Sequence, residues 1–240
     1  MSLKVPSTYS GSIDWVEVYR QHYSIDTIET RLSGYLYGRS EILFAGFGEV
    51  ANRLASDHDV HYVEYSAAMV EAARREFTRI GRITHGNILD VARRCPSKVI
   101  LVTCRISAYW HHSEDVQQIL NAVSLNDTQL LVIDFFDVTK MESTPTLGDI
   151  SFSSVKPDSV NESRDSSAND CIPTLVKVAG AYDCSDARYC FEETRAYYSK
   201  QGLLDGVRVR LPDYDIFVEP PIVVGDPGFT IVARKKPLSC

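Results

Sequence analysis

The chain has 240 residues, of which 44% are hydrophobic, and a formal net charge of -7. This length is enough for one α/β domain with a buried core, and an acidic chain lacks the broad basic face that a nucleic acid requires, so we expect a small-molecule partner. No run of about 18 apolar residues is present and the N-terminus has no signal-peptide pattern, which predicts no membrane partner and a cytoplasmic location.

The first predicted element is an N-terminal helical arm that ends near residue 40. Residues 14–37 carry apolar and aromatic positions at helical spacing, and Asp14 stands where it can cap the helix. Trp15, Tyr19 and Tyr23 recur every four residues, so they share one helix face. An aromatic stripe of this kind belongs either to the core or to a site that the arm covers.

Beyond the arm, apolar runs typical of buried strands alternate with segments of helical length. The predicted strands are "EILFAG", "VHYVEY", "RITHGN", "KVILVTC" and "QLLVIDFF". The segments between them include "SAAMVEAARREFTRI" and "SEDVQQILNAVSL". This alternation predicts a parallel sheet with helices on both faces.

The alternation stops between residues 138 and 183, where the chain is rich in Ser, Asp and Pro. So long an irregular run is either a functional lid or a plain insertion. We then expect a helix over "RYCFEETRAYYSKQGL", strands in "VRVRLPDYDIFVE" and "FTIVARKK", and an antiparallel hairpin of these two strands at the sheet edge. Residues 1–240 are predicted to form a single domain.

The end of the first strand carries a nucleotide-binding pattern. In "GFGEVA", Gly46, Gly48 and Ala51 satisfy G-x-G-x-x-A. Glu64 ends the second strand, where one carboxylate can accept from both hydroxyls of a ribose. A dinucleotide or adenosylmethionine would use such a loop and acid, so the next residues must separate the two.

The stretch "VEYSAAMVEAARRE" resembles the second signature of the class I S-adenosylmethionine-dependent methyltransferases. The resemblance continues in register through "ITHGN", "VTCRISAYWHHSED", "LLVIDFF" and "FTIVARKK", over residues 40–136 and 190–236. A short-chain dehydrogenase needs Tyr-x-x-x-Lys, and "AYYSK" has Ala196 in place of that tyrosine. The resemblance implies an α/β Rossmann-like class I methyltransferase fold, with a mostly parallel seven-stranded sheet, an antiparallel closing strand and helices on both faces.

The resemblance also implies S-adenosylmethionine as the cofactor and a set of residues that contact it. These are Gly46, Gly48, Glu64, Tyr65, Asn87, Ile88, Cys104, Tyr19 and Tyr23. Tyr65 and Ile88 would enclose the adenine, and Asn87 would accept from its amino group. Alternatives without a role in cofactor binding stay open. The glycines would then only supply a positive φ, Glu64 would be a solvated charge, and Tyr65 and Ile88 would belong to the core.

Two departures from the family pattern concern the first loop. The family places an acid two residues before the first glycine, near the cofactor's ammonium group, and this chain has Phe44 there. The usual third glycine is Val50. These changes predict weaker binding of the cofactor, and Phe44 predicts an altered contact with its amino-acid end.

Candidate catalytic residues follow the fourth and fifth strands. Tyr109, His111 and His112 stand after the fourth, where an imidazole can accept a proton from a phenol or an amine. Asp134 ends the fifth strand and can orient a cationic amine. The alternatives are that His112 caps the following helix and that Asp134 accepts from backbone donors. The six cysteines show no spacing typical of a zinc site, so no metal is predicted.

The sequence therefore predicts methyl transfer from S-adenosylmethionine to an N, O or C atom of a small metabolite. One alternative is an enzyme of the same fold that transfers the aminocarboxypropyl group, cyclises the cofactor, or uses it in a rearrangement. A second is a scaffold subunit that binds no cofactor.

Overall fold

The computed structural model describes residues 20–21, 23–140, 152–154, 171–184 and 187–237. Trp15 and Tyr19 of the aromatic stripe lie outside this part, as do most residues of the predicted lid, which therefore stays a prediction. Within the described part, α2 (Ile25–Ser33) is the main helix of the N-terminal arm. None of the described helices is both long and apolar enough to cross a membrane.

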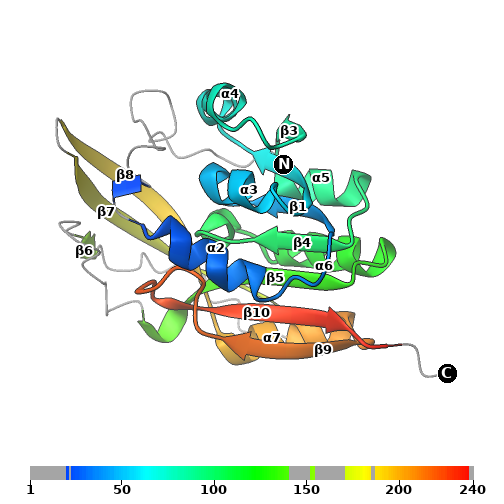
Figure 1. The fold of residues 1–240 in the computed structure, drawn as a ribbon. Helices are drawn as coiled ribbons and strands as arrows, with labels where there is room; N and C mark the ends of the chain where they lie inside the picture. The colour runs from blue at the N-terminus through cyan, green and yellow to red at the C-terminus, as the bar shows by residue number, and fades with distance from the viewer. Residues whose placement is uncertain (1–19, 22, 141–151, 155–170, 185–186, 238–240) are drawn as a thin grey trace.

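The centre of the molecule is the predicted sheet (Figure 1). Five strands pair in parallel in the order β3-β2-β1-β4-β5. Their bounds are β1 Glu41–Ala45, β2 Asp59–Glu64, β3 Arg82–His85, β4 Val99–Val102 and β5 Leu130–Asp137. Next to β5, β10 (Gly228–Lys235) runs antiparallel, and β9 (Tyr214–Glu219) pairs with β10 as the predicted edge hairpin. The seven-stranded arrangement is confirmed, and the described residues contain three more strands.

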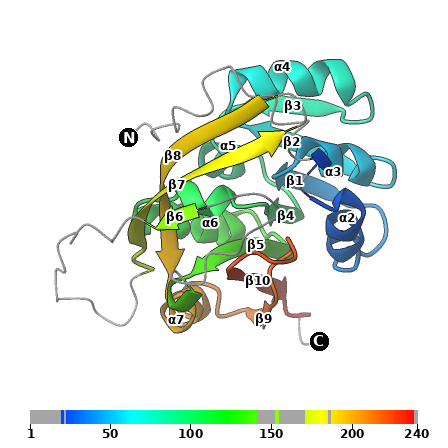
Figure 2. The same cartoon turned by 90° about the vertical axis from the view of Figure 1, so that its left-hand side faces the viewer.

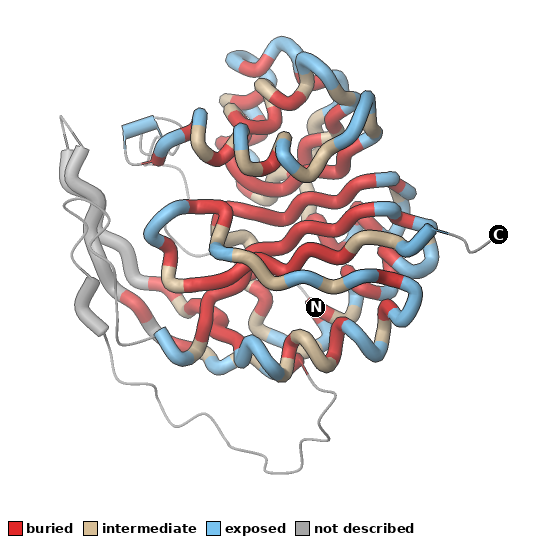
Figure 3. The backbone as a smooth tube through the Cα atoms, turned by 60° about the horizontal axis from the view of Figure 1, so that its bottom comes forward, coloured by how far each residue is buried: buried red, intermediate tan, exposed pale blue. Residues whose placement is uncertain are grey.

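Helices cover both faces of the sheet, as the sequence predicts. One face packs against α2, α3 (Gly48–Leu54) and α4 (Ala67–Glu76), and its core includes Ile42 and Phe44 of β1. The other packs against α5, α6 and α7, and its core includes the alternate β1 residues Leu43 and Ala45. These helices span Ile88–Arg94, Ser113–Leu125 and Lys200–Arg210. Because successive side chains of a strand point to opposite faces, β1 is buried along most of its length (Figure 3).

Three additional strands join the sheet at the end of β5, on the edge where β4 has ended, because β10 occupies the other edge. They are β6 (Phe152–Ser154), β7 (Thr174–Cys184) and β8 (Ala187–Tyr198), paired antiparallel in sequence order. The last residues of β5 pair in parallel with the end of β8, through Phe136 with Tyr197. Figures 1 and 2 show that the long β7–β8 ribbon lies on the side where the parallel strands end. The expectation of irregular structure up to residue 183 is therefore wrong for β7.

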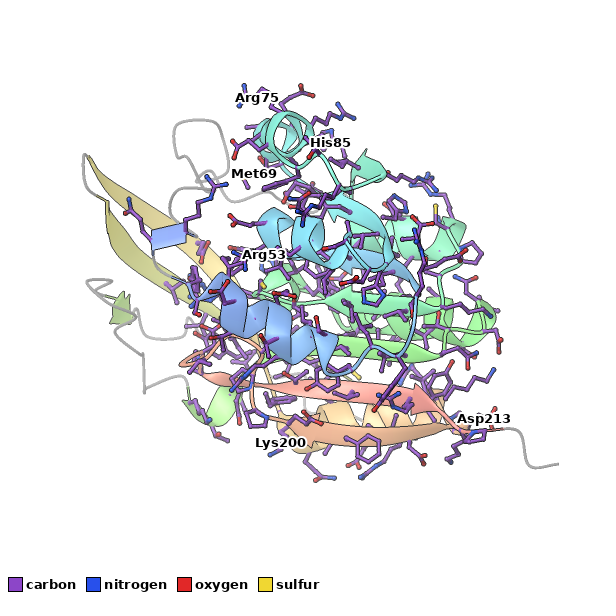
Figure 4. All side chains as sticks on the ribbon, viewed as in Figure 1. Arg53, Met69, Arg75, His85, Lys200 and Asp213 are labelled. Atoms are coloured by element: carbon purple, nitrogen blue, oxygen red, sulfur yellow. The ribbon has the colours of Figure 1, made fainter. Side chains whose placement is uncertain are left out.

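The predicted helix over residues 188–203 is also wrong. This segment is β8 up to Tyr198, and α7 begins only at Lys200, labelled in Figure 4, with Ser199 as its N-cap. The last residues of α7, "VRVR", were expected to begin a strand. Because β8 pairs along its length with β7, non-local hydrogen bonds override a local pattern that fits a helix.

The boundary of α7 predicts a contrast between two valines. In a strand, Val207 and Val209 would point to the same face, but in α7 Val207 is 1% exposed and Val209 is 59% exposed. Val207→Ala should lower the free energy of unfolding by about 2 kcal/mol, because it leaves a cavity in the core. Val209→Ala should change it by less than about 0.5 kcal/mol. Denaturant titrations measure both, and equal losses would contradict the helix.

Candidate active site

The glycine loop after β1 is held close to its neighbours. Neither Gly46 nor Gly48 has a positive φ, so the alternative that these glycines supply one is wrong. A Cβ on Gly46 would lie 2.8 Å from Thr103 Oγ1, and a Cβ on Gly48 would lie 2.5 Å from Phe77 Cε2. The missing side chains therefore let the loop pass tightly between the end of β4 and the end of α4.

Glu64, at the end of β2, is linked to this loop. The Tyr62 hydroxyl lies 2.8 Å from Glu64 Oε2 and 3.3 Å from the carbonyl oxygen of Gly46. The Ser66 amide donates to Glu64 Oε1 at 2.7 Å. The backbone of Tyr65 also donates to this carboxylate, so three of its four lone pairs are used and one remains for a ribose hydroxyl. Burial raises the pKa of this carboxyl. An acceptor at this strand end fits a hydroxyl of the ribose of adenosylmethionine.

The predicted adenine contacts lie at the ends of β2 and β3. The Gly86 amide donates to the Glu64 carbonyl oxygen at 2.9 Å, which brings the following Asn87 beside Glu64 and Tyr65. Asn87 is the N-cap of α5, and its Oδ1 accepts from the Leu89 amide at 3.1 Å. Ile88 is buried in the core, and His85, labelled in Figure 4, places Nε2 2.9 Å from the Tyr65 carbonyl oxygen. The contact of Tyr65, Asn87 and Ile88 with adenine stays a prediction.

The turn after β4 has a strained backbone. Cys104 and Arg105 are consecutive residues in the left-handed region, with φ of 58° and 70°. Such residues cost about 1–3 kcal/mol each and persist where surrounding contacts hold them. The buried thiol of Cys104 has its pKa raised to about 12 by desolvation. The following residues form the short helix η2 (Ile106–Tyr109).

Asp134 of β5 is hydrogen-bonded to this turn. Its buried carboxylate accepts from the Cys104 amide at 3.3 Å, the Ile222 amide at 3.3 Å and Thr230 Oγ1 at 2.6 Å. These contacts match the alternative that Asp134 serves backbone donors, and they connect β5 to the turn and to the loop between β9 and β10. Burial outweighs the three hydrogen bonds and raises the pKa of Asp134 to about 7.

Two buried ion pairs flank Phe136 at the end of β5. Arg105 Nε lies 3.1 Å and 3.0 Å from the two carboxylate oxygens of Asp226. Arg195 pairs with Glu193 from the same strand, β8. The guanidinium carbons of Arg105 and Arg195 lie 5.9 Å and 5.7 Å from the centroid of the Phe136 ring. None of these four charged residues is among the site residues predicted from the sequence.

Signals for these residues are weak in the sequence. A strand of residues 187–198 would place Glu193 and Arg195 on the same face, since they are two positions apart, but the segment was predicted as a helix. Arg105 follows a predicted strand and Asp226 lies in a predicted loop, and only the tertiary structure pairs residues 121 positions apart.

The predicted residues after β4 have different positions. The Tyr109 hydroxyl donates to Glu193 Oε2 at 3.1 Å, which joins it to the ion pair on β8. His111 is half-buried, its Nε2 lies 3.0 Å from the Thr194 carbonyl oxygen, and burial lowers its pKa. A carbonyl only accepts, so Nε2 must carry the proton in this contact. His112 is exposed and is the N-cap of α6, the position that the capping alternative predicts.

Known proteins share this architecture. Neither protein-family models nor curated protein sequences give a match to the chain. A S-adenosylmethionine-dependent methyltransferase from Clostridium acetobutylicum superposes with a TM-score of 0.63 and 13% identity, over 93% of this chain and 96% of that one. The sugar N-methyltransferase KedS8 from a Streptoalloteichus species superposes with a TM-score of 0.59 and 15% identity, over 99% of both chains.

A third similar structure contains the cofactor. It is S-adenosylmethionine-bound CalS10 from Micromonospora, an amino pentose methyltransferase, with a TM-score of 0.55 and 10% identity over 95% of this chain and 94% of that one. All three structures share the fold of this chain, although the sequence identities are low. The chain therefore has the fold of the class I S-adenosylmethionine-dependent methyltransferases.

The raised pKa of Asp134 predicts a pH-dependent stability. Burial raises this pKa from an ordinary 3.8 to about 7. Between about pH 4 and pH 7 the folded state holds a proton that the unfolded chain has released, so the free energy of unfolding falls as the pH rises. Asp134→Asn removes this titration, so the stability of wild type relative to the variant should fall over the same window. Denaturant titrations at several pH values measure it, and a constant difference would contradict the raised pKa.

Proposed function

We propose that the protein binds S-adenosylmethionine across the ends of β3, β2 and β1 and transfers its methyl group to a small-molecule acceptor. The supporting observation is the connection of the Gly46 loop to Glu64 through the Tyr62 hydroxyl, at neighbouring strand ends of a methyltransferase fold. Glu64 would hold the ribose, and Tyr65, Asn87 and Ile88 would surround the adenine.

When bound, the cofactor supplies an electrophilic methyl group on a sulfonium, and the chain's own residues align the acceptor with it. The acceptor would lie beyond the cofactor, near the ends of β5 and β8. Phe136 provides an apolar wall there, and Tyr109, held by Glu193, provides a polar contact. A phenol hydroxyl both donates and accepts hydrogen bonds, so it is a chemically suitable contact for a substrate N–H or O–H. This geometry favours an amine or hydroxyl acceptor.

The named activities of the similar structures support a small-molecule acceptor. One is a sugar N-methyltransferase and another is an amino pentose methyltransferase. The buried ion pairs near Phe136 suit an acceptor with polar groups more than a purely apolar one. We therefore propose a polar small molecule, with transfer to nitrogen or oxygen.

A second candidate is a different reaction of the same cofactor. Phe44 of β1 stands where the family has an acid, and its fully buried ring lies 3.0 Å from a Cβ built on Gly46. A changed contact with the aminobutyryl chain would suit transfer or cyclisation of that chain. The reaction products separate the candidates: adenosylhomocysteine indicates methyl transfer, methylthioadenosine indicates chemistry on the chain, and intact cofactor indicates neither.

That product analysis tests the proposed function. The purified protein is incubated with S-adenosylmethionine and a small-molecule extract of its source, and mass spectrometry follows the cofactor. We expect adenosylhomocysteine together with an extract component 14 mass units heavier, the mass of an added CH₂. A scaffold subunit would leave the cofactor intact with every extract.

The ribose contact predicts the effect of a nearly isosteric change. Glu64→Gln replaces one acceptor oxygen by a donor, so the affinity for adenosylhomocysteine should fall by on the order of 2 kcal/mol, roughly 30-fold. Glu71→Gln, at an exposed position of α4, is the matched control and should leave the affinity unchanged. Isothermal titration calorimetry measures both, and an unchanged affinity in Glu64→Gln would exclude this ribose site.

A further inference from the structure

We propose that the Arg105–Asp226 ion pair binds the amino-acid end of the cofactor. This end is a zwitterion, in which a carboxylate and an ammonium group share one carbon. A guanidinium and a carboxylate side by side present the complementary charges. The inference rests on the proposed function, because it takes the cofactor to be S-adenosylmethionine.

The order of the strands places this end near β4. In the order β3-β2-β1-β4-β5, adenine at β3 and ribose at Glu64 of β2 leave β1 and β4 for the remainder of the molecule. Neighbouring strands are about 4.8 Å apart, so the end of β4 lies about 10 Å from the end of β2. The turn that carries Arg105 directly follows β4.

This turn is in contact with the glycine loop. Gly46 adjoins Thr103, as the 2.8 Å distance from its Cβ position shows. The guanidinium carbon of Arg105 lies 5.3 Å from the centroid of the Tyr23 ring, and the Tyr23 and Phe47 rings are 4.9 Å apart. A ligand that crosses the glycine loop from Glu64 therefore reaches the Arg105 turn next. Tyr23, predicted as a cofactor contact, also belongs to this group.

The ion pair has the chemistry that the zwitterion requires. The Arg105 and Asp226 side chains are 10% and 6% exposed, so a ligand there meets little competing water. Hydrogen bonds to Asp226 come from Nε and Nη2. A guanidinium donates hydrogen bonds and a carboxylate accepts them, so the pair presents both of the charges that complement a zwitterion.

The free-energy cost of the buried ion pair and its strained turn is a second observation that favours a binding role. A buried ion pair contributes little net stability, and two consecutive left-handed residues cost free energy. Phe44, fully buried in β1, supplies no charge for an ammonium group. Asp226 is the acid that the tertiary structure brings to the neighbouring strand end instead.

The test compares two ligands that differ in the amino-acid end. Adenosylhomocysteine has this end and methylthioadenosine lacks it. Arg105→Gln should weaken adenosylhomocysteine by about 10- to 100-fold, the loss of a charge-assisted contact, and methylthioadenosine by less than about threefold. Asp226→Asn should show the same selectivity. Calorimetric titration measures the affinities, and retained binding of methylthioadenosine shows that each variant has folded.

Arg234→Gln is the control. The guanidinium carbon of Arg234 also lies over an aromatic ring, 5.1 Å from the centroid of Tyr37, but Arg234 pairs with Leu130 at the start of β5, the end of the sheet opposite to the site. Its change should leave both affinities within about threefold. In wild type, decarboxylated adenosylmethionine should bind more weakly than adenosylmethionine, and Arg105→Gln should not distinguish the two.

The outcomes separate the two proposals. Equal losses for both ligands, or no loss in Arg105→Gln, would show that Arg105 only holds the turn, and would overturn the inference while the proposed function stands. If wild type binds neither adenosylhomocysteine nor methylthioadenosine, the proposed function and the inference are both overturned.

Discussion

The buried carboxylate of Asp134 is the contact on which the geometry of the candidate site depends. It accepts from Cys104, Ile222 and Thr230, which belong to the turn after β4, the loop before β10 and β10 itself. Removal of such an acceptor leaves buried donors without a partner, at a cost of about 1–3 kcal/mol each. The strained turn that carries Arg105 therefore depends on a residue of the next strand.

The buried carboxylates at the edge where the parallel strands end are held by different partners near β2 than near β5 and β8. Glu64, at the end of β2, is held by hydrogen bonds from Tyr62 and Ser66. Asp226 and Glu193, nearer to β5 and β8, are each held by an arginine. A carboxylate held by neutral donors suits hydroxyl groups, whereas buried ion pairs suit charged groups in defined orientations. This division matches a cofactor with a ribose at one end and a zwitterion at the other.

Strands that are buried on both faces were predicted correctly, whereas the strand that depends on a distant partner strand was not. β1, β4 and β5 are buried on both faces, so their continuous apolar runs identify them without any knowledge of neighbours. Residues 188–203 contain polar, apolar and aromatic positions that fit a helix as well as a half-buried strand. The partner strand β7 decides between them, and it belongs to a segment whose composition indicated a loop.

The sequence by itself determined the alternation of strands and helices, the tight loop at Gly46 and the acid at the tip of β2, because each depends on residues adjacent in the chain. Contacts between distant segments were decided only by the tertiary structure. Asp226 reaches Arg105, and Tyr109 reaches Glu193, through the order of the strands and the β7–β8 ribbon. No local pattern encodes such a pairing, because the free energy that selects it comes from burial and non-local hydrogen bonds.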